Sequence, residues 1–360
     1  MINDKDVDKP ISDFVREQTD ININRYSDGG ANGELYFGER NVLKDRVALK
    51  FYYYNPTYST HEEPLLLKEI KHKNILEIFD AKIIDKQYAY FLTPEISGGD
   101  LQRFLSKNII STHTAINIIQ GVLKGLAELH KEENSLVHRD LKPNNILIDK
   151  ETLTPYIADF GSIKKIEDGK DEAIASKNTF IYKPYESLID NIYRRESDLY
   201  QVGIILFQLL GGKFPNAAAD WLNEKDRKKL LTISNSFDQW QFIEEIINRK
   251  IVKGKLLDNN SLPLYIDKGL KRIINTATHT DYTKRYRTCS EFLKALYDYL
   301  KSTKNWWQEI NDYFAIKGNT TYKISPIKEK YELFIKKKTW RRDKSQLGTL
   351  KPIIEYVIKK

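Results

Sequence analysis

Two polar clusters in the middle of the chain combine residue types that suit phosphoryl transfer. The first is His138-Arg-Asp-Leu-Lys-Pro-Asn-Asn145, and the second is Asp159-Phe-Gly161. Transfer of a phosphoryl group needs cations and positioned oxygens around a polyphosphate, together with one carboxylate aimed at the incoming hydroxyl. Either cluster alone could belong to an ordinary surface loop, but the two together at this spacing rarely arise by chance.

The two clusters supply one group for each of these tasks. Asp140 can accept the proton of the hydroxyl, and Lys142 can neutralise the transferred phosphoryl group. Asn145 offers an amide oxygen and Asp159 a carboxylate oxygen, which are ligands that Mg²⁺ prefers. The sequence therefore predicts a site for a metal ion and a polyphosphate.

Short predicted elements border both clusters and would position them. The stretch from Thr114 to His130 has its apolar residues on one helical stripe. The apolar run Ile146-Leu-Ile148 follows the first cluster, and Tyr156-Ile-Ala158 precedes the second, so each cluster should adjoin a short strand.

The chain changes character at Gly98-Gly99. Before this point, β-rich runs punctuated by Gly and Asn indicate an antiparallel sheet with one helix near Leu65 to Ile70. After it, the pattern is mainly helical, and the stretch from Ser197 to Leu210 is apolar nearly all round, which is typical of a buried helix. Further helices are predicted at about 238–250, 265–277 and 290–300. We predict an α+β fold with a small β-rich lobe, a connector and a larger helical lobe.

Composition sets broad limits on the class of protein. With 360 residues, of which 41% are hydrophobic, the chain can bury one large two-lobed core and an appendage, which excludes a disordered protein. A single cysteine, Cys289, excludes a disulfide framework and suits a reducing compartment. No run approaches the roughly 18 apolar residues of a membrane span. We therefore expect a cytoplasmic protein with no membrane partner.

The net positive charge is concentrated at the C-terminal end. Residues 301–360 contain 15 Lys and Arg against 6 Asp and Glu, whereas the net charge of the whole chain is +8. Trp306, Trp307, Ile310, Tyr313 and Phe314 recur at helical spacing, so we expect a basic helical extension. Two roles remain open for it: a surface that binds an acidic partner or nucleic acid, or a helix packed on the large lobe through its aromatic residues.

Both polar clusters resemble the motifs of the eukaryotic-type (Hanks) protein kinase family, and the resemblance extends over about residues 22–297. It implies the bilobal protein-kinase fold, with an N-lobe at about 22–93 and a C-lobe at about 97–297, preceded by an N-terminal arm (1–21) and followed by an extension (298–360). It also implies ATP and Mg²⁺ as cofactors and a protein as substrate.

The resemblance implies a lysine and a glutamate that pair in the small lobe. Val47-Ala-Leu-Lys50 matches the family's strand lysine, and counting back from the end of the next helix gives Glu63 as its partner, with Glu62 as the alternative. Pro64 is tolerated only near the first turn of a helix, and Thr60 with Glu63 forms a capping-box pattern. We therefore expect this helix to be short or displaced at its start.

The Gly-rich loop and the connector complete the nucleotide site that the resemblance implies. Asp28 stands where the family has its first glycine, although Gly29 is adjacent. Thr93 would be the gatekeeper, Pro94 to Ile96 would face the adenine, and Asp100 would accept from a ribose hydroxyl. The implied cofactor-binding residues are Gly29, Gly30, Gly33, Leu35, Ala48, Lys50, Thr93, Pro94, Ile96, Asp100 and Asp159. The implied catalytic residues are Lys50, Glu63, Asp140, Lys142 and Asn145, with Asn145 and Asp159 on the metal.

Downstream residues have implied supporting roles. Glu186, in the altered closing motif Pro184-Tyr-Glu186, would pair with Arg285, and Asp198 would anchor the catalytic loop. Lys142 and Thr179 resemble the Ser/Thr branch of the family. Arg139 suggests control by a phosphate on the loop between the second cluster and Thr179, at Ser176 or at Thr179 itself.

The sequence leaves three functions open. The first is a protein kinase that phosphorylates Ser and Thr and also phosphorylates itself. The second is a pseudokinase that binds a nucleotide or a partner without transfer. This function is supported by Asp28, Pro64 and the altered Pro184-Tyr185. The third is phosphorylation of a small molecule.

Overall fold

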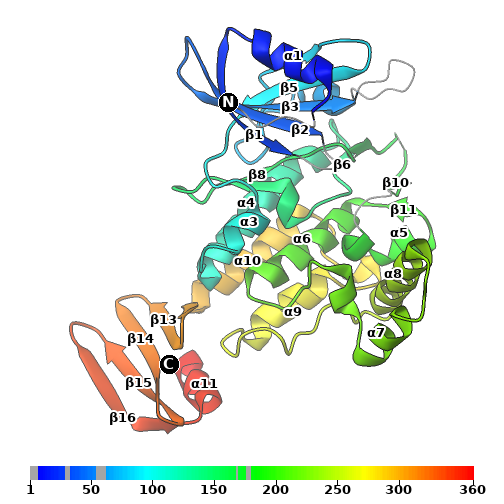
Figure 1. Ribbon diagram of the computed structural model, residues 1–360. Helices are drawn as coiled ribbons and strands as arrows, with labels where there is room; N and C mark the ends of the chain where they lie inside the picture. Colours follow the sequence, from blue (N-terminus) through cyan, green and yellow to red (C-terminus); the bar gives the residue numbers. More distant parts are fainter. Residues whose placement is uncertain (1–6, 29–32, 54–61, 168, 176–179) are drawn as a thin grey trace.

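The computed structural model describes residues 7–28, 33–53, 62–167, 169–175 and 180–360. The chain forms a small lobe, a larger helical lobe beneath it, and an extension at the far end of the large lobe (Figure 1). The predicted α+β, two-lobed organisation is confirmed.

The small lobe is a five-stranded antiparallel sheet in the order β1-β2-β3-β5-β4. Helix α1 packs on it through Ile11 and Val15, which are buried against Tyr36 and Phe51 of the sheet. The predicted N-terminal arm therefore includes a helix that belongs to the core of this lobe. The elements are α1 (Lys9–Glu17), β1 (Ile21–Asp28), β2 (Glu34–Arg40), β3 (Arg46–Tyr53), α2 (Glu62–Leu67), β4 (Asp80–Ile83) and β5 (Tyr88–Pro94).

The large lobe is built around two helices, α4 (Thr112–His130) and α6 (Arg195–Leu209). Most residues of α6 are buried, as predicted from the stretch Ser197 to Leu210, which is apolar nearly all round. The other helices are α3 (Leu101–Leu105), α5 (Tyr185–Ile189), α7 (Glu224–Leu230), α8 (Ser236–Val252), α9 (Lys268–Ala277) and α10 (Cys289–Ser302). Short strands pair above them: β6 (Leu136–Val137) with β9 (Lys164–Lys165), β7 (Ile146–Ile148) with β8 (Pro155–Ile157), and β10 (Ala173–Ile174) with β11 (Ile192–Tyr193).

The C-terminal extension is a second antiparallel sheet, so the predicted helix over Trp306 to Phe314 is wrong. Its five strands lie in sequence order, and after the end of α10 the only helix in this part of the chain, which the structure describes in full, is α11. The elements are β12 (Asn305–Glu309), β13 (Asp312–Lys317), β14 (Thr320–Ile327), β15 (Lys330–Lys336), β16 (Trp340–Gly348) and α11 (Leu350–Lys359).

A tight hairpin explains the wrong helix. Ile310 has a left-handed backbone (φ 55°), and the chain reverses so that Glu309 pairs with Asp312. Trp307 then lies opposite Phe314 on the neighbouring strand. The aromatic spacing that fits a helical stripe therefore also fits two paired strands, and aromatic residues favour strands.

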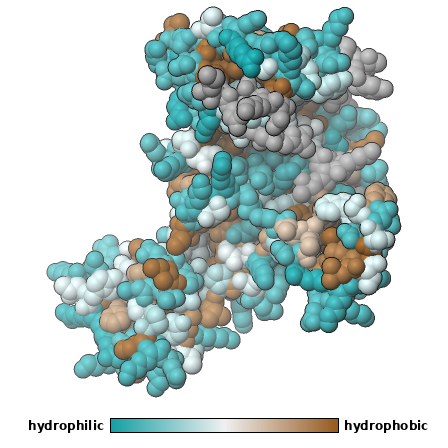
Figure 2. Space-filling model, viewed as in Figure 1, coloured by the Kyte–Doolittle hydropathy of each residue, from teal (hydrophilic) through white to brown (hydrophobic). Residues whose placement is uncertain are grey.

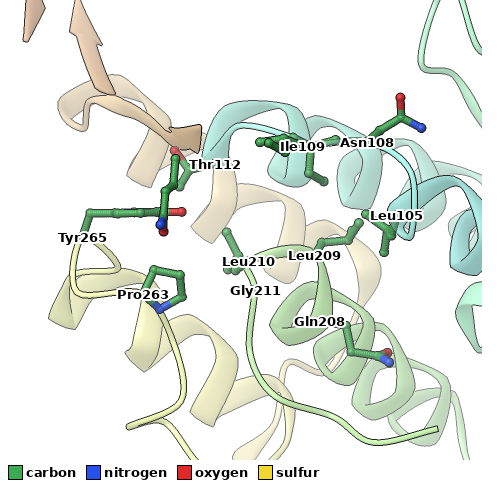
Figure 3. Close-up of a pocket in the computed structure, with 12 residues that line it drawn as sticks. Leu105, Asn108, Ile109, Thr112, Gln208, Leu209, Leu210, Gly211, Pro263 and Tyr265 are labelled. Carbon is green, nitrogen blue, oxygen red and sulfur yellow. The ribbon is translucent and has the colours of Figure 1, made fainter. Parts of the chain in front are cut away.

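The extension is joined to the large lobe at the start of α4. The side chain of Asn305 accepts from the backbone N–H of His113 (3.0 Å), and Thr112 Oγ1 accepts from the N–H of Trp306 (2.9 Å). The Trp306 ring stacks on Tyr265, with centroids 5.6 Å apart. A cavity of about 350 Å³ lies beside this junction, between Thr112, Pro263 and the end of α6 (Figure 3).

None of the helices that the structure describes is both long enough and apolar enough to cross a membrane.

Candidate active site

The catalytic loop between β6 and β7 brings the predicted base and its neighbours together. Asp140 is only 7% exposed, and its Oδ2 accepts from Lys142 Nζ (2.9 Å) and from Asn145 Nδ2 (3.0 Å). Asn145 lies in a 3₁₀ turn, Pro143–Asn145, where its Nδ2 also donates to the carbonyl of Asp140 (2.8 Å). These two bonds leave the amide oxygen of Asn145 as the atom available to a metal ion.

Asp198 of α6 lies where it was predicted, beneath this loop. It accepts from the N–H of His138 (2.9 Å) and the N–H of Arg139 (3.0 Å), and it contacts His130 Nε2 (2.8 Å). Burial raises the pKa of Asp198, but its hydrogen bond with His130 and the charge of that ring outweigh burial and leave the pKa below its ordinary value. A buried carboxylate thus fixes the backbone just before the base.

Sequence reasoning missed a second anchor in the same helix, Gln201. Its Oε1 accepts from the N–H of Leu141 (2.7 Å), and its Nε2 donates to the carbonyl of Tyr182 (3.3 Å), just before the altered closing motif Pro184-Tyr-Glu186. Gln201 is 2% exposed. A glutamine inside a helix that is expected to be buried is the signal that could have identified it, because a buried amide needs partners.

Two residues of the site have a left-handed backbone. Arg139 has φ 69° and Asp159 has φ 57°, and neither is a glycine. Such conformations cost of order 1–3 kcal/mol each and persist only where the surroundings enforce them. Here the carboxylate of Asp198 and the strands beside the two clusters supply that enforcement.

Lys50 reaches from the small lobe to the second cluster. Its Nζ lies 2.9 Å from Asp159 Oδ1, and each side chain is about one fifth exposed. Burial raises the pKa of Asp159, but the charge and hydrogen bond of Lys50 outweigh burial and hold the pKa below its ordinary value. Asp159 therefore remains a carboxylate at neutral pH.

The two predicted metal ligands lie side by side. Asn145 directly precedes β7, and Asp159 is the second residue after β8; these strands pair as a hairpin. The N–H of Ala158 donates to the carbonyl of Asn145 (2.9 Å), which brings the two ligands to the same end of the hairpin. An amide oxygen and a charged carboxylate at this point fit a hard cation such as Mg²⁺.

The pairing of strands in the small-lobe sheet aligns several of the residues that are predicted to bind the nucleotide. Lys50 pairs with Leu35 on β2, and Ala48 pairs with Thr93 on β5. Gly33 has φ 92°, and a Cβ there would lie 2.0 Å from the carbonyl oxygen of Phe51, so only glycine fits. Gly29 and Gly30 lie outside the described residues.

The connector follows β5 and packs on the large lobe. The N–H of Gly98 donates to the carbonyl of Ile148 (2.9 Å), and a Cβ on Gly98 would clash with that oxygen. Pro94 ends β5, and Ile96 lies in the connector itself. Asp100 caps α3 by accepting from the N–H of Arg103 (2.8 Å), which assigns Oδ1 to the helix and leaves the predicted ribose contact to Oδ2.

Helix α2 is short, as Pro64 predicts. It spans Glu62–Leu67, so Pro64 lies in its first turn, where a missing backbone donor is tolerated. The side chains of Glu62 and Glu63 and all of Thr60 lie outside the described residues, and the pairing of Glu63 with Lys50 therefore stays a prediction.

The predicted ion pair between Glu186 and Arg285 is present and fully buried. The two terminal guanidinium nitrogens of Arg285 each lie 2.8 Å from a carboxylate oxygen of Glu186, and the side chains of Glu186 and Arg285 are 2% and 0% exposed. Ser197 also donates to Glu186. The pair joins α5 to the loop before α10 and takes no direct part in chemistry.

Arg139 is bound to the loop that follows the second cluster. Its guanidinium donates to the carbonyls of Ser162 and Ile174, both at 2.6 Å. The predicted phosphate acceptors Ser176 and Thr179 lie outside the described residues. The Arg139 contacts therefore show how this loop is held, and the phosphate stays a prediction.

The sequence matches the protein kinase domain family over residues 29–297. It is 29% identical over 254 residues to the mouse (Mus musculus) ribosomal protein S6 kinase alpha-6, a match that covers 69% of this chain and 30% of that protein. It is 27% identical over 254 residues to the Arabidopsis thaliana G-type lectin S-receptor-like serine/threonine-protein kinase SRK, covering 63% of this chain and 29% of that protein. The chain thus spans roughly a third of the length of these relatives. Because the family match covers well over half of its residues, the chain belongs to the protein kinase domain family.

Proposed function

We propose that this protein kinase transfers the γ-phosphoryl group of ATP to Ser and Thr hydroxyls of a protein substrate and also phosphorylates itself. The contact between Lys142 and Asp140 carries the proposal, because it puts a cation beside the base at the point where phosphoryl charge develops. Lysine at this position resembles the Ser/Thr branch of the family. Of the two relatives compared above, one is named a serine/threonine-protein kinase and the other a ribosomal protein S6 kinase.

Each residue has a defined task in the proposed reaction. Asp140 accepts the proton of the hydroxyl as the hydroxyl oxygen attacks the γ-phosphorus, the bond from that phosphorus to the bridging β-phosphate oxygen breaks, and ADP leaves. Lys142 balances the charge of the transferred group. Lys50 orients the phosphates of ATP. A divalent ion, generally Mg²⁺ in this family, would be held by Asn145 and Asp159 and would offset the negative charge of the phosphates.

An exposed apolar surface beside Phe180, a few residues before the altered closing motif, supports a protein substrate over a small molecule. Phe180 packs edge-on against Trp240 of α8 (5.1 Å between centroids), and Trp240 and Phe237 are 49% and 64% exposed. Figure 2 shows a hydrophobic patch over this part of the large lobe. Exposed aromatic side chains of this kind are typical of surfaces that contact proteins.

The test uses the full chain, ATP labelled at the γ-phosphorus, and three peptide pools that differ only in a Ser, Thr or Tyr acceptor. We expect label on the Ser and Thr pools and on the protein itself, and none with Asp140→Asn. Label on the Tyr pool alone would contradict the Ser/Thr assignment.

A second candidate function is a pseudokinase that binds nucleotide without transfer. The short helix α2 favours it. Thermal unfolding with Mg-ATP separates the two. A protein that is stabilised by Mg-ATP but labels no pool and not itself would be the pseudokinase.

A further inference from the structure

The sheet of the extension has one covered face and one open face. Helix α11 lies on one side of it (Figure 1). There Ile354 and Val357 of α11 are buried together with Ile324 and Leu333 of the sheet. Side chains alternate between the two faces along each strand, so the residues between these buried ones belong to the open face.

Strand register aligns five residues in one row across the open face. Residues that pair across antiparallel strands point to the same side of the sheet. The continuous pairing runs from β12 to β16 through Trp307, Phe314, Lys323, Phe334 and Arg342. With strands about 4.8 Å apart, the row is about 19 Å long. Three aromatic rings and two cations therefore lie along a single line, which we call the aromatic–basic row.

A second line of residues adds to this row on the same face. Ile316 pairs with Thr321, Thr321 with Lys336, and Lys336 with Trp340. Trp340 is 43% exposed, and Lys336 Nζ lies 5.8 Å from the centre of its ring. The open face thus offers further aromatic surface at the strand end where the β15–β16 hairpin turns.

Positive charge without counter-ions gathers at the same end. Lys323 pairs with Asp312 and Arg342 with Glu332. Within the part of the chain that the structure describes, no carboxylate forms a salt bridge with Lys336 on the open face or with Lys337 and Lys338 in the β15–β16 hairpin. Segment 301–360 as a whole has 15 basic residues against 6 acidic ones. An anionic ligand would complement this surface.

We propose that the open face binds single-stranded nucleic acid. Unpaired bases can stack on flat aromatic side chains while the backbone phosphates contact cations beside them. A duplex hides its bases and offers this surface only its phosphates, and an acidic peptide would leave the aromatic residues unused. RNA and DNA share the required chemistry. The extension lies at the end of the large lobe away from the small lobe, so the site is separate from the phosphoryl-transfer centre (Figure 1).

Fluorescence anisotropy of the full chain tests the proposal. The probes are labelled oligo(U) and oligo(dT) single strands of about 15 nucleotides, a duplex of the same length, and an oligoglutamate peptide. We expect both or one of the single strands to bind more tightly than the duplex and the peptide, with affinity falling between about 50 mM and about 200 mM salt. Equal or tighter binding of the peptide, or no binding of either single strand at the lower salt, would overturn it.

Two variants and a matched control localise the binding. Trp340→Ala should weaken single-strand binding roughly tenfold, since it removes a stacking surface, and Lys336→Glu should weaken it and reduce the salt dependence. Lys351→Glu makes the same charge change on α11, at the covered side of the sheet, and should bind nearly as the unaltered protein does. Because Lys336 and Trp340 are exposed, their replacement should leave thermal unfolding unchanged. If Lys351→Glu weakens binding as much as Lys336→Glu, the binding reflects overall charge and the proposed site is wrong.

Discussion

The catalytic centre and the open face of the extension handle charge in opposite ways. In the centre, cations meet carboxylates at close range in a largely buried site, as in Lys50 with Asp159 and Lys142 with Asp140. On the extension, Lys336 and the two lysines of the β15–β16 hairpin, Lys337 and Lys338, are exposed to solvent. Charges in a protected site interact strongly and depend on geometry, whereas exposed charges are screened by salt. Activity in the catalytic centre should therefore depend on the exact geometry of its side chains. Ligand binding by the open face should depend on net charge and ionic strength.

The largest effect should come from the catalytic base. Asp140→Asn keeps the size of the side chain but removes the proton acceptor, so we expect kcat on a Ser peptide to fall by about 10²–10⁴-fold. Steady-state kinetics measure this, and Lys351→Glu is the control that should keep its kcat. A fall of less than threefold in Asp140→Asn would show that Asp140 is not the base.

The buried ion pair should give the largest loss of stability. Arg285→Ala leaves the carboxylate of Glu186 buried and unpaired, which costs about 3–5 kcal/mol in the free energy of unfolding. Urea denaturation measures it. The exposed pair of Lys294 with Asp298 is the matched comparison, and Lys294→Ala should change the midpoint very little. If the urea midpoint fell equally in both variants, protected and exposed charges would not differ in their contribution to stability.

Asp198 should make the free energy of unfolding depend on pH in the acidic range. Its pKa in the folded protein is below the ordinary value, so the unfolded chain takes up a proton first as the pH falls. The contribution of Asp198 is then complete above the ordinary pKa and is lost as the pH falls from about 5 toward the folded pKa. Asp198→Asn should be less stable at neutral pH and lose less stability between about pH 5 and pH 3. Parallel curves for the two proteins would mean that other groups control the acid range.

The smallest effect should come from the junction with the extension. Thr112→Val keeps the shape of a buried side chain but removes the acceptor for the N–H of Trp306, at a cost of about 1–2 kcal/mol. Hydrogen exchange should be faster at the amide of Trp306, while kcat on a peptide stays the same. Slower turnover would show that the extension and the catalytic centre are coupled.

Chemistry explains why the catalytic loop could be predicted from sequence. Phosphoryl transfer restricts the residue types at four positions, so their pattern can be recognised in the sequence alone. These positions are Asp140, Lys142, Asn145 and Asp159. Gln201 could not be predicted in the same way, because its partners are backbone atoms that any sequence provides. The two-lobed fold was predictable from the change of pattern at Gly98-Gly99, but the role of α1 in the small-lobe core was not, since it depends on which face meets the sheet.

The extension was mispredicted because one spacing fitted two structures. Helical stripes and paired strands can both bring Trp307 near Phe314, and only the left-handed turn at Ile310 decides between them. The same turn creates the aromatic–basic row, because it sets the register of the first two strands. Register, which depends on contacts across strands, is the information that the linear sequence carried least clearly.

The single cysteine gives the molecule a useful property for spectroscopy. Cys289 is 3% exposed, and burial raises the pKa of its thiol, so it should not react with thiol-directed dyes in the folded protein. A cysteine introduced as Lys338→Cys in the β15–β16 hairpin would then be the one reactive thiol. A fluorophore placed there could report on the extension in the otherwise natural sequence, with the native cysteine left in place.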